Sequence, residues 1–154
     1  MEVHSARAHR LRALVLLALI LVGTGLLLTR CPANRDGMPG QLAQAMQETT
    51  SAARSGAAAL DMWTQRRATT QLTSVALSDS RNEVVNAYKG IAELRAEDPV
   101  DIQRQQILTT SMTSIIGALN AASATVRGVE SEPPAERIRS DLLNAAAALE
   151  SGYR

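Results

Sequence analysis

The feature of this sequence that most constrains its fold is a recurrence of apolar residues at alternating steps of four and three. The recurrence is clearest between residues 99 and 129, at Leu108, Met112, Ile115, Leu119, Ala122, Val126 and Val129. Steps that average about 3.5 residues place all members on one face of an α-helix that packs against other helices. No apolar run with a period of two competes with this pattern, and the chain has no phenylalanine. The sequence therefore predicts an all-α fold.

Three further segments carry similar stripes. The first begins near Gln41 and comprises Leu42, Met46, Thr49, Ala53, Gly56, Leu60, Trp63 and Arg67. The second contains Val84, Tyr88 and Ile91, and the last contains Ile138, Leu142, Ala145 and Leu149. We therefore predict that residues 40–154 form one domain, an antiparallel bundle of about four helices.

Two of the connections between these helices are marked by proline. The segment "RAEDPVD" offers Asp98 as an N-cap and Pro99 for the first helical position, where the missing N–H has no helical partner to lose. In the segment "GVESEPPAE", Pro133 and Pro134 are expected to open the last helix. Both segments predict the start of a helix.

The connection between the first two helices is marked by neither glycine nor proline, and two positions compete for it. Ser80, with Glu83 three residues later, forms a capping-box pattern, and a break there makes helices of about 38 and 17 residues. A break near "RRATTQ" instead gives four helices of about 27, 27, 31 and 18 residues, which pack evenly along each other. We favour the second position, which leaves Ser80 inside a helix.

An apolar segment near the N-terminus predicts a membrane anchor. Residues 13–29 are 17 residues without a charge, between Arg12 and Arg30. Their helix is about 25 Å long, at the short end of what spans a bilayer. The basic tail at residues 1–12 predicts a cytoplasmic N-terminus, and residues 30–39 have the composition of a Pro/Gly linker. We therefore expect a single-pass protein of the cell membrane, with the domain at residues 40–154 outside the cytoplasm.

Two other interpretations of this segment stay open. A signal peptide cleaved after the loosely matching Gly23 to Gly25 would release the domain as a secreted protein. A lipoprotein signal would modify Cys31, but the bulky charge of Arg30 directly before it disfavours processing. A buried soluble helix is a poorer explanation, because it would be apolar on every face in a chain too small to surround it.

The positions of histidine and cysteine exclude much chemistry. His4 and His9 precede the apolar segment and Cys31 follows it, so residues 40–154 contain neither residue type. This excludes Ser-His-Asp and Cys-His catalysis, an intramolecular disulfide framework, and the usual zinc, copper and haem ligands. We therefore expect a protein that is not an enzyme, with no catalytic residue, metal or cofactor.

The charge balance bears on the partners. From Cys31 onward the chain has 12 Lys and Arg residues against 14 Asp and Glu residues, a net charge of −2. This near balance argues against nucleic acid, which needs a basic face. Of the 16 basic residues in the whole chain, 15 are arginine, a usage typical of GC-rich bacterial genomes.

Few residues stand out as candidates for an interaction. Trp63 lies close to Arg66 and Arg67 in the sequence, and Trp and Arg are common at binding hot spots. Tyr88 is a second candidate. For Trp63 and Tyr88 the simpler explanation is core packing. Arg67 lies on an apolar stripe, so it marks either the end of the helix or a buried site for an anionic group.

Two features favour a protein partner or self-association. Alanine fills many stripe positions, so each residue buries little apolar area, and burial stabilises by only about 25 cal/mol per Å². Cys31 is the single thiol, directly outside the predicted membrane segment. An unpaired cysteine there suggests an intermolecular disulfide or a free reactive thiol.

Together these observations favour a membrane-anchored helical bundle that acts as an interaction or accessory component of a bacterial cell envelope. A sensor-like ligand-binding bundle is the first alternative. One membrane helix followed by such a bundle looks like the input half of bacterial receptors, although no receptor motif matches. A helical enzyme of chorismate-mutase type, working with Arg, Lys and carboxylates alone, is the second alternative, but we cannot place the active-site pattern of those enzymes in this sequence.

Overall fold

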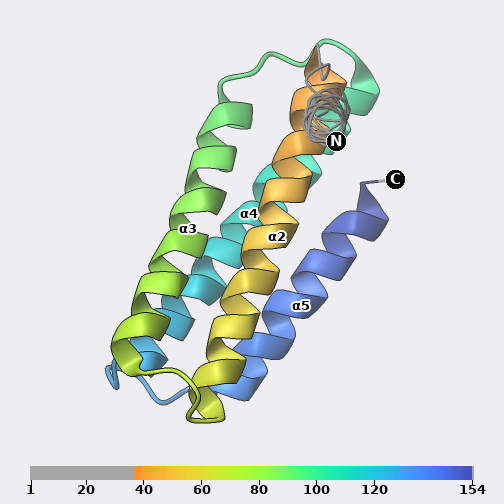
Figure 1. Cartoon of the computed structure of the whole chain (residues 1–154). Helices are drawn as coiled ribbons and strands as arrows, with labels where there is room; N and C mark the ends of the chain where they lie inside the picture. The colour runs from red at the N-terminus through yellow and green to blue at the C-terminus, as the bar shows by residue number, and fades with distance from the viewer. Residues whose placement is uncertain (1–36, 154) are drawn as a thin grey trace, which may run out of the picture. The chain divides into compact units, whose positions relative to one another are not determined.

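The structure, a computed structural model of the 154-residue chain, describes residues 37–153, all within one compact unit at residues 36–154. The predicted tail and membrane segment, most of the linker, and Cys31 lie outside the described residues. Within them the fold is all-helical, a bundle of four helices without a strand (Figure 1). The helices are α2 (Met38–Thr64), α3 (Thr70–Ala92), α4 (Pro99–Val126) and α5 (Ala135–Gly152).

The connection between α2 and α3 lies at residues 65–69, the second of the two positions considered from the sequence. Thr69 is the N-cap of α3, and its side-chain oxygen accepts a hydrogen bond from the backbone N–H of Leu72 at 3.3 Å. Ser80 lies inside α3 and is buried. Its capping-box pattern is therefore coincidental, because a cap needs a helix end with unpaired N–H groups.

The starts of the other helices follow their prolines. Asp98 caps α4 by accepting a hydrogen bond from the backbone N–H of Val100 at 2.8 Å, and Pro99 occupies the first turn. Helix α5 begins directly after Pro134. Met38 and Pro39, which the sequence assigned to the linker, already form the first turn of α2, since proline is tolerated where a helix begins.

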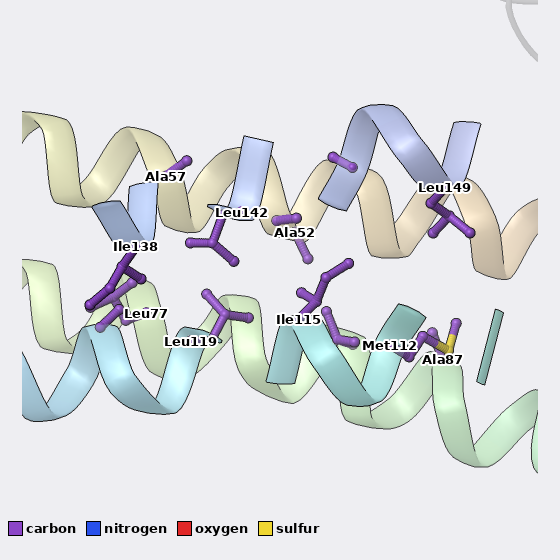
Figure 2. Close-up of a cluster of buried hydrophobic side chains, with 14 of the residues drawn as sticks. Ala52, Ala57, Leu77, Ala87, Met112, Ile115, Leu119, Ile138, Leu142 and Leu149 are labelled. Atoms are coloured by element: carbon purple, nitrogen blue, oxygen red, sulfur yellow. The ribbon is translucent and has the colours of Figure 1, made fainter. Parts of the chain in front are cut away.

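A layer of large and small side chains fills the middle of the bundle. Leu77, Leu119 and Leu142 are fully buried and point inward from α3, α4 and α5 (Figure 2). Opposite them, α2 supplies Gly56, where an added Cβ atom would come within 2.5 Å of Cδ2 of Leu119. The missing side chain lets α2 approach α4. The backbone of α2 lies close to all three other helices, whereas the backbones of α3 and α5 do not come close to each other.

The predicted stripes match the buried faces except near helix ends. Leu108, Leu119 and the stripe members between them are buried as predicted. Val129 and Arg67 are instead exposed, because α4 ends at Val126 and α2 ends at Thr64. The stripe of α5 turns slightly, so that Ala146 is buried and Ala145 is only half-buried. The alternative of a buried anion site at Arg67 was therefore wrong, and the alternative of a helix end is correct.

Helix α4 is the one helix in the described part of the chain that is long and apolar enough to cross a membrane. Part of its apolar surface, at Leu108, Ile115 and Leu119 among others, is buried against the other helices of the bundle. A core helix of a bundle meets the same test of length and composition, so this finding assigns no membrane span.

One end of the bundle is closed by side chains that bind the chain itself, and we call it the tied end. It comprises the start of α2, the end of α3, the start of α4 and the end of α5 (Figure 1). The side-chain amide of Gln105 in α4 donates hydrogen bonds to the backbone oxygens of Ile91 and Leu94, at 2.6 and 3.0 Å. The oxygen of Ile91 also accepts a 3.2 Å hydrogen bond from the backbone N–H of Leu94, so Gln105 adds to the bonds that close the end of α3.

A second set of contacts joins α4, α5 and α2 at the tied end. The guanidinium of Arg104 lies over the ring of Tyr153, 5.2 Å from its centre, and forms a 3.8 Å ion pair with the buried Asp101. The hydroxyl of Tyr153 donates a 3.4 Å hydrogen bond to the backbone oxygen of Pro39. The three helices are therefore linked by one chain of polar contacts.

An exposed ion pair also links α2 to α5 along their length. Arg54 donates a 2.8 Å hydrogen bond to Oε2 of Glu150. This hydrogen bond and the negative charge of Glu150 raise the pKa of Arg54. Since arginine is charged at any physiological pH, the shift leaves the charge of the pair unchanged.

Candidate functional site

A hollow of about 720 Å³ lies at the other end of the bundle, which we call the hollow end. Its walls come from the end of α2, the end of α4 with the connection that follows, and the start of α5. The lining residues are Trp63, Thr64, Arg66, Thr125, Gly128, Val129, Glu130, Ser131, Pro134, Ala135 and Glu136. The hollow is therefore built where two helices end and a third begins.

The end of α2 places Arg66 in this wall. The backbone N–H of Arg66 donates to the oxygen of Trp63 at 2.9 Å, and that of Arg67 donates to the oxygen of Met62 at 2.8 Å. This pair of bonds is the Schellman motif, which needs a left-handed residue directly after the helix. Arg66 takes that conformation with a φ of 57°, at a cost of about 1–2 kcal/mol for a residue with a Cβ atom.

The end of α4 repeats the same motif with the expected residue. Gly128 has a φ of 70°. Its N–H donates to the oxygen of Thr125 at 3.0 Å, and the N–H of Val129 donates to the oxygen of Ala124 at 2.9 Å. Glycine adopts this conformation without steric cost. The two motifs line one hollow, and only the one in α2 carries a charged side chain at the left-handed position.

Trp63 forms an aromatic part of the wall. Its indole N–H donates a 3.4 Å hydrogen bond to Oγ1 of Thr70 at the start of α3. The side chain is half-buried and packs against the hydrophobic core. Trp63 therefore has a structural role and also presents apolar surface to the hollow, so the two interpretations of this residue from the sequence do not exclude each other.

Charges of both signs line the hollow without pairing. Arg66 contributes a guanidinium, and Glu130 and Glu136 contribute carboxylates. Within the described residues, none of the three takes part in an ion pair. The nearby charges of Asp61 and Arg139, by contrast, pair at 3.2 Å between α2 and α5. The hollow therefore presents a guanidinium and two carboxylates that form no ion pair within the described residues.

The structure separates the residues that the sequence singled out. Trp63 and Arg66 lie in the same hollow, whereas Arg67 is exposed and is not among its lining residues. Tyr88 is half-buried against the core, near the end of α3 that belongs to the tied end. Cys31 lies outside the described residues.

Sequence reasoning missed the second wall of the hollow. Glu130 and Glu136 belong to the segment "GVESEPPAE", which the sequence marked only as a break between helices, and Val129 was assigned to the apolar stripe before it. The available signal was two connections rich in charged residues. The position of the first break was open, so the sequence did not settle whether Trp63 and Arg66 lie at a helix end, near that second connection.

The hollow offers charged groups, hydrogen-bonding groups and apolar surface. Its lining contains neither histidine nor cysteine. In the described part of the chain, no three His, Cys, Asp or Glu residues lie close enough together to hold a metal ion. No protein-family model, curated protein or solved structure matches the chain, so any function has to be argued from these residues.

Proposed function

We propose that the chain is a membrane-anchored bundle outside the cytoplasm that acts as a non-catalytic interaction or accessory component of a bacterial cell envelope. Residues 13–29 are the anchor, with the N-terminus in the cytoplasm, and the four described helices form an antiparallel bundle. The observation that carries the interaction role is the unpaired charges beside Trp63 at the hollow end.

Contacts between α2 and α5 support the antiparallel sense. Asp61 near the end of α2 pairs with Arg139 near the start of α5. Tyr153 at the end of α5 binds Pro39 at the start of α2. The end of α2 thus contacts the start of α5, and the start of α2 contacts the end of α5, as expected for two antiparallel neighbours in a bundle.

The place of the hollow along α2 supports an outward-facing interaction. Helix α2 has 27 residues, so its two ends are about 40 Å apart. The linker enters α2 at its first residue, and Trp63 lies in its last turn. In an anchored protein the hollow end is therefore one helix length away from the point of attachment, where a partner can reach it.

The anchor is tested by the intact mass of the mature protein purified from membranes. The proposal predicts the mass of a chain that retains residues 13–29. A chain that begins at Leu26 or Asn34 would contradict the anchor, and a diacylglycerol adduct on Cys31 would identify a lipoprotein instead.

The interaction is tested by a photo-crosslinking amino acid placed at each end of the bundle in the full-length protein. Val129 at the hollow end and Val100 at the tied end are a matched pair, with exposed fractions of 72% and 54%. The proposal predicts a discrete adduct in native membranes from position 129 and none from position 100. Equal capture at both positions, or none at position 129, would contradict a binding role for the hollow end.

A second candidate function is a ligand-binding bundle of the sensor-like kind. The observation that favours it is the volume of the hollow, about 720 Å³, which lies within the range of roughly 300–1,000 Å³ found for small-molecule sites. A ligand that raises the melting temperature of the full-length protein, and fails to do so in an Arg66→Gln variant, would support this candidate.

A further inference from the structure

We propose that the hollow binds a small zwitterion with an apolar body, either a free amino acid or a short peptide. Arg66 binds its carboxylate, Glu130 and Glu136 bind its ammonium group, and Trp63 contacts its apolar part. The inference deepens the second candidate function, the ligand-binding bundle, and does not depend on a protein partner.

The charges of the hollow exclude the simpler ligands. A purely anionic ligand would meet Arg66 but also two carboxylates, and a purely cationic ligand would meet those carboxylates but also Arg66. Like charges brought close together are unfavourable. A molecule with a positive and a negative end satisfies both kinds of group, because none of the three is already paired within the described residues.

The backbone from which the guanidinium of Arg66 extends is ordered. Two hydrogen bonds of 2.8 and 2.9 Å fix the turn that carries Arg66, and φ at that residue is 57°. A guanidinium binds a carboxylate with two parallel hydrogen bonds. A turn that is already ordered lowers the entropy lost when the ligand binds.

The remaining walls suit an apolar body. Trp63, Val129 and Pro134 line the hollow beside the charged groups. Val129 is 72% exposed, so a ligand there removes apolar surface from water. Amino acids and short peptides with aliphatic side chains combine such a body with two charged ends.

Trp63 is the one tryptophan of the chain, so its fluorescence reports directly on the hollow. The experiment titrates the full-length protein in detergent with leucine and with leucyl-leucine. It also uses two blocked forms of the dipeptide, N-acetyl-leucyl-leucine without the ammonium group and leucyl-leucinamide without the carboxylate. The proposal predicts a saturable change in emission with leucine or leucyl-leucine, and affinities at least about tenfold weaker for each blocked form. The tighter of the first two ligands distinguishes a free amino acid from a peptide.

Matched variants assign the two charged groups. Arg66→Gln is expected to weaken binding of leucyl-leucine at least about tenfold, so that its affinity no longer exceeds that of leucyl-leucinamide. Arg67→Gln is expected to leave the affinities for these two ligands unchanged. Glu130→Gln is expected to reduce the difference in affinity between leucyl-leucine and N-acetyl-leucyl-leucine. Glu132→Gln is the control and should leave this difference unchanged. Circular dichroism checks that each variant is folded.

Three results would overturn the inference. They are no saturable change in Trp63 emission with either zwitterion, equal affinity for the blocked and unblocked dipeptides, or an effect of Arg67→Gln as large as that of Arg66→Gln. None of them bears on crosslinking from position 129, so failure of this inference and failure of the proposed interaction role are distinguishable.

Discussion

At the tied end of the bundle polar side chains bind the chain itself, whereas at the hollow end several of them bind nothing within the described residues. Gln105 completes the hydrogen bonds of two carbonyls at the end of α3, and Arg104 lies over Tyr153. Arg66, Glu130 and Glu136 share a hollow without pairing. The charged side chains available to another molecule are thus concentrated at the hollow end, beside contacts such as the Asp61–Arg139 ion pair that join the helices there.

The two ends of α2 and α4 at the hollow add a second contrast. Both helices end in a Schellman motif, but α4 uses Gly128 and α2 uses Arg66 for the left-handed residue. The chain accepts backbone strain at one of two equivalent positions and gains a guanidinium there. Strain of this kind is often found at functional sites.

Both ends of the bundle are held by one hydrophobic core, so a charge placed in this core has the largest expected effect. Leu119→Asp is expected to unfold the bundle, because it places an unpaired charge at a fully buried position, which costs several kcal/mol. Leu143→Asp, at a position 37% exposed on α5, is the control and should remain folded. Thermal unfolding followed by circular dichroism measures both, and an unchanged melting temperature for Leu119→Asp would show that the buried face is wrongly assigned.

The close approach of α2 to α4 is the next largest effect. Gly56→Ala is expected to destabilise the bundle by about 1–3 kcal/mol, since Cδ2 of the fully buried Leu119 has to move. Gly117→Ala on the exposed face of α4, where an added Cβ atom meets nothing within 4 Å, should stabilise it by about 0.5–1 kcal/mol. Urea unfolding separates the two, and equal effects would contradict the packing described here.

A change at the tied end should cost stability as well. Gln105→Ala leaves the backbone oxygens of Ile91 and Leu94 without the amide donor, which is expected to cost about 1–3 kcal/mol. Gln103→Ala on the exposed side of the same helix should change the free energy of unfolding by less than about 0.5 kcal/mol. If Gln105→Ala were as neutral as its control, the tied end would not be held as proposed.

The smallest expected effects concern the two Schellman motifs. Arg66→Gly should stabilise the bundle by about 1 kcal/mol, because glycine adopts a positive φ without steric cost. Gly128→Ala should destabilise it by a similar amount, about 1 kcal/mol. A loss of stability in Arg66→Gly, again measured by urea unfolding, would mean that the side chain of Arg66 supports the fold.

The sequence predicted the helices better than it predicted the site, for a physical reason. A stripe such as Leu108 to Leu119 is a local consequence of burying one helix face, so its period is visible without the partner helices. The end of α2 was ambiguous because Arg66 stands where glycine normally marks a Schellman motif. The hollow could not be predicted from the sequence, because 66 residues of chain lie between Trp63 and Glu130. Only the packing of the helices brings these two residues to the same hollow.

Arg104 and Gln105 at the tied end are expected to support the fold, whereas Arg66 and Glu130 at the hollow end are not. Two double variants of the unit at residues 36–154 measure this difference. Arg66→Gln/Glu130→Gln changes the hollow end, and Arg104→Gln/Gln105→Ala changes the tied end. Glu136 is left intact, because a carboxylate in the first turn of α5 stabilises that helix by about 0.3–1 kcal/mol. Urea unfolding should show the hollow-end variant within about 0.5 kcal/mol of the wild type, and the tied-end variant less stable by about 2 kcal/mol or more. Equal losses in the free energy of unfolding would show that Arg66 and Glu130 support the fold as much as Arg104 and Gln105 do.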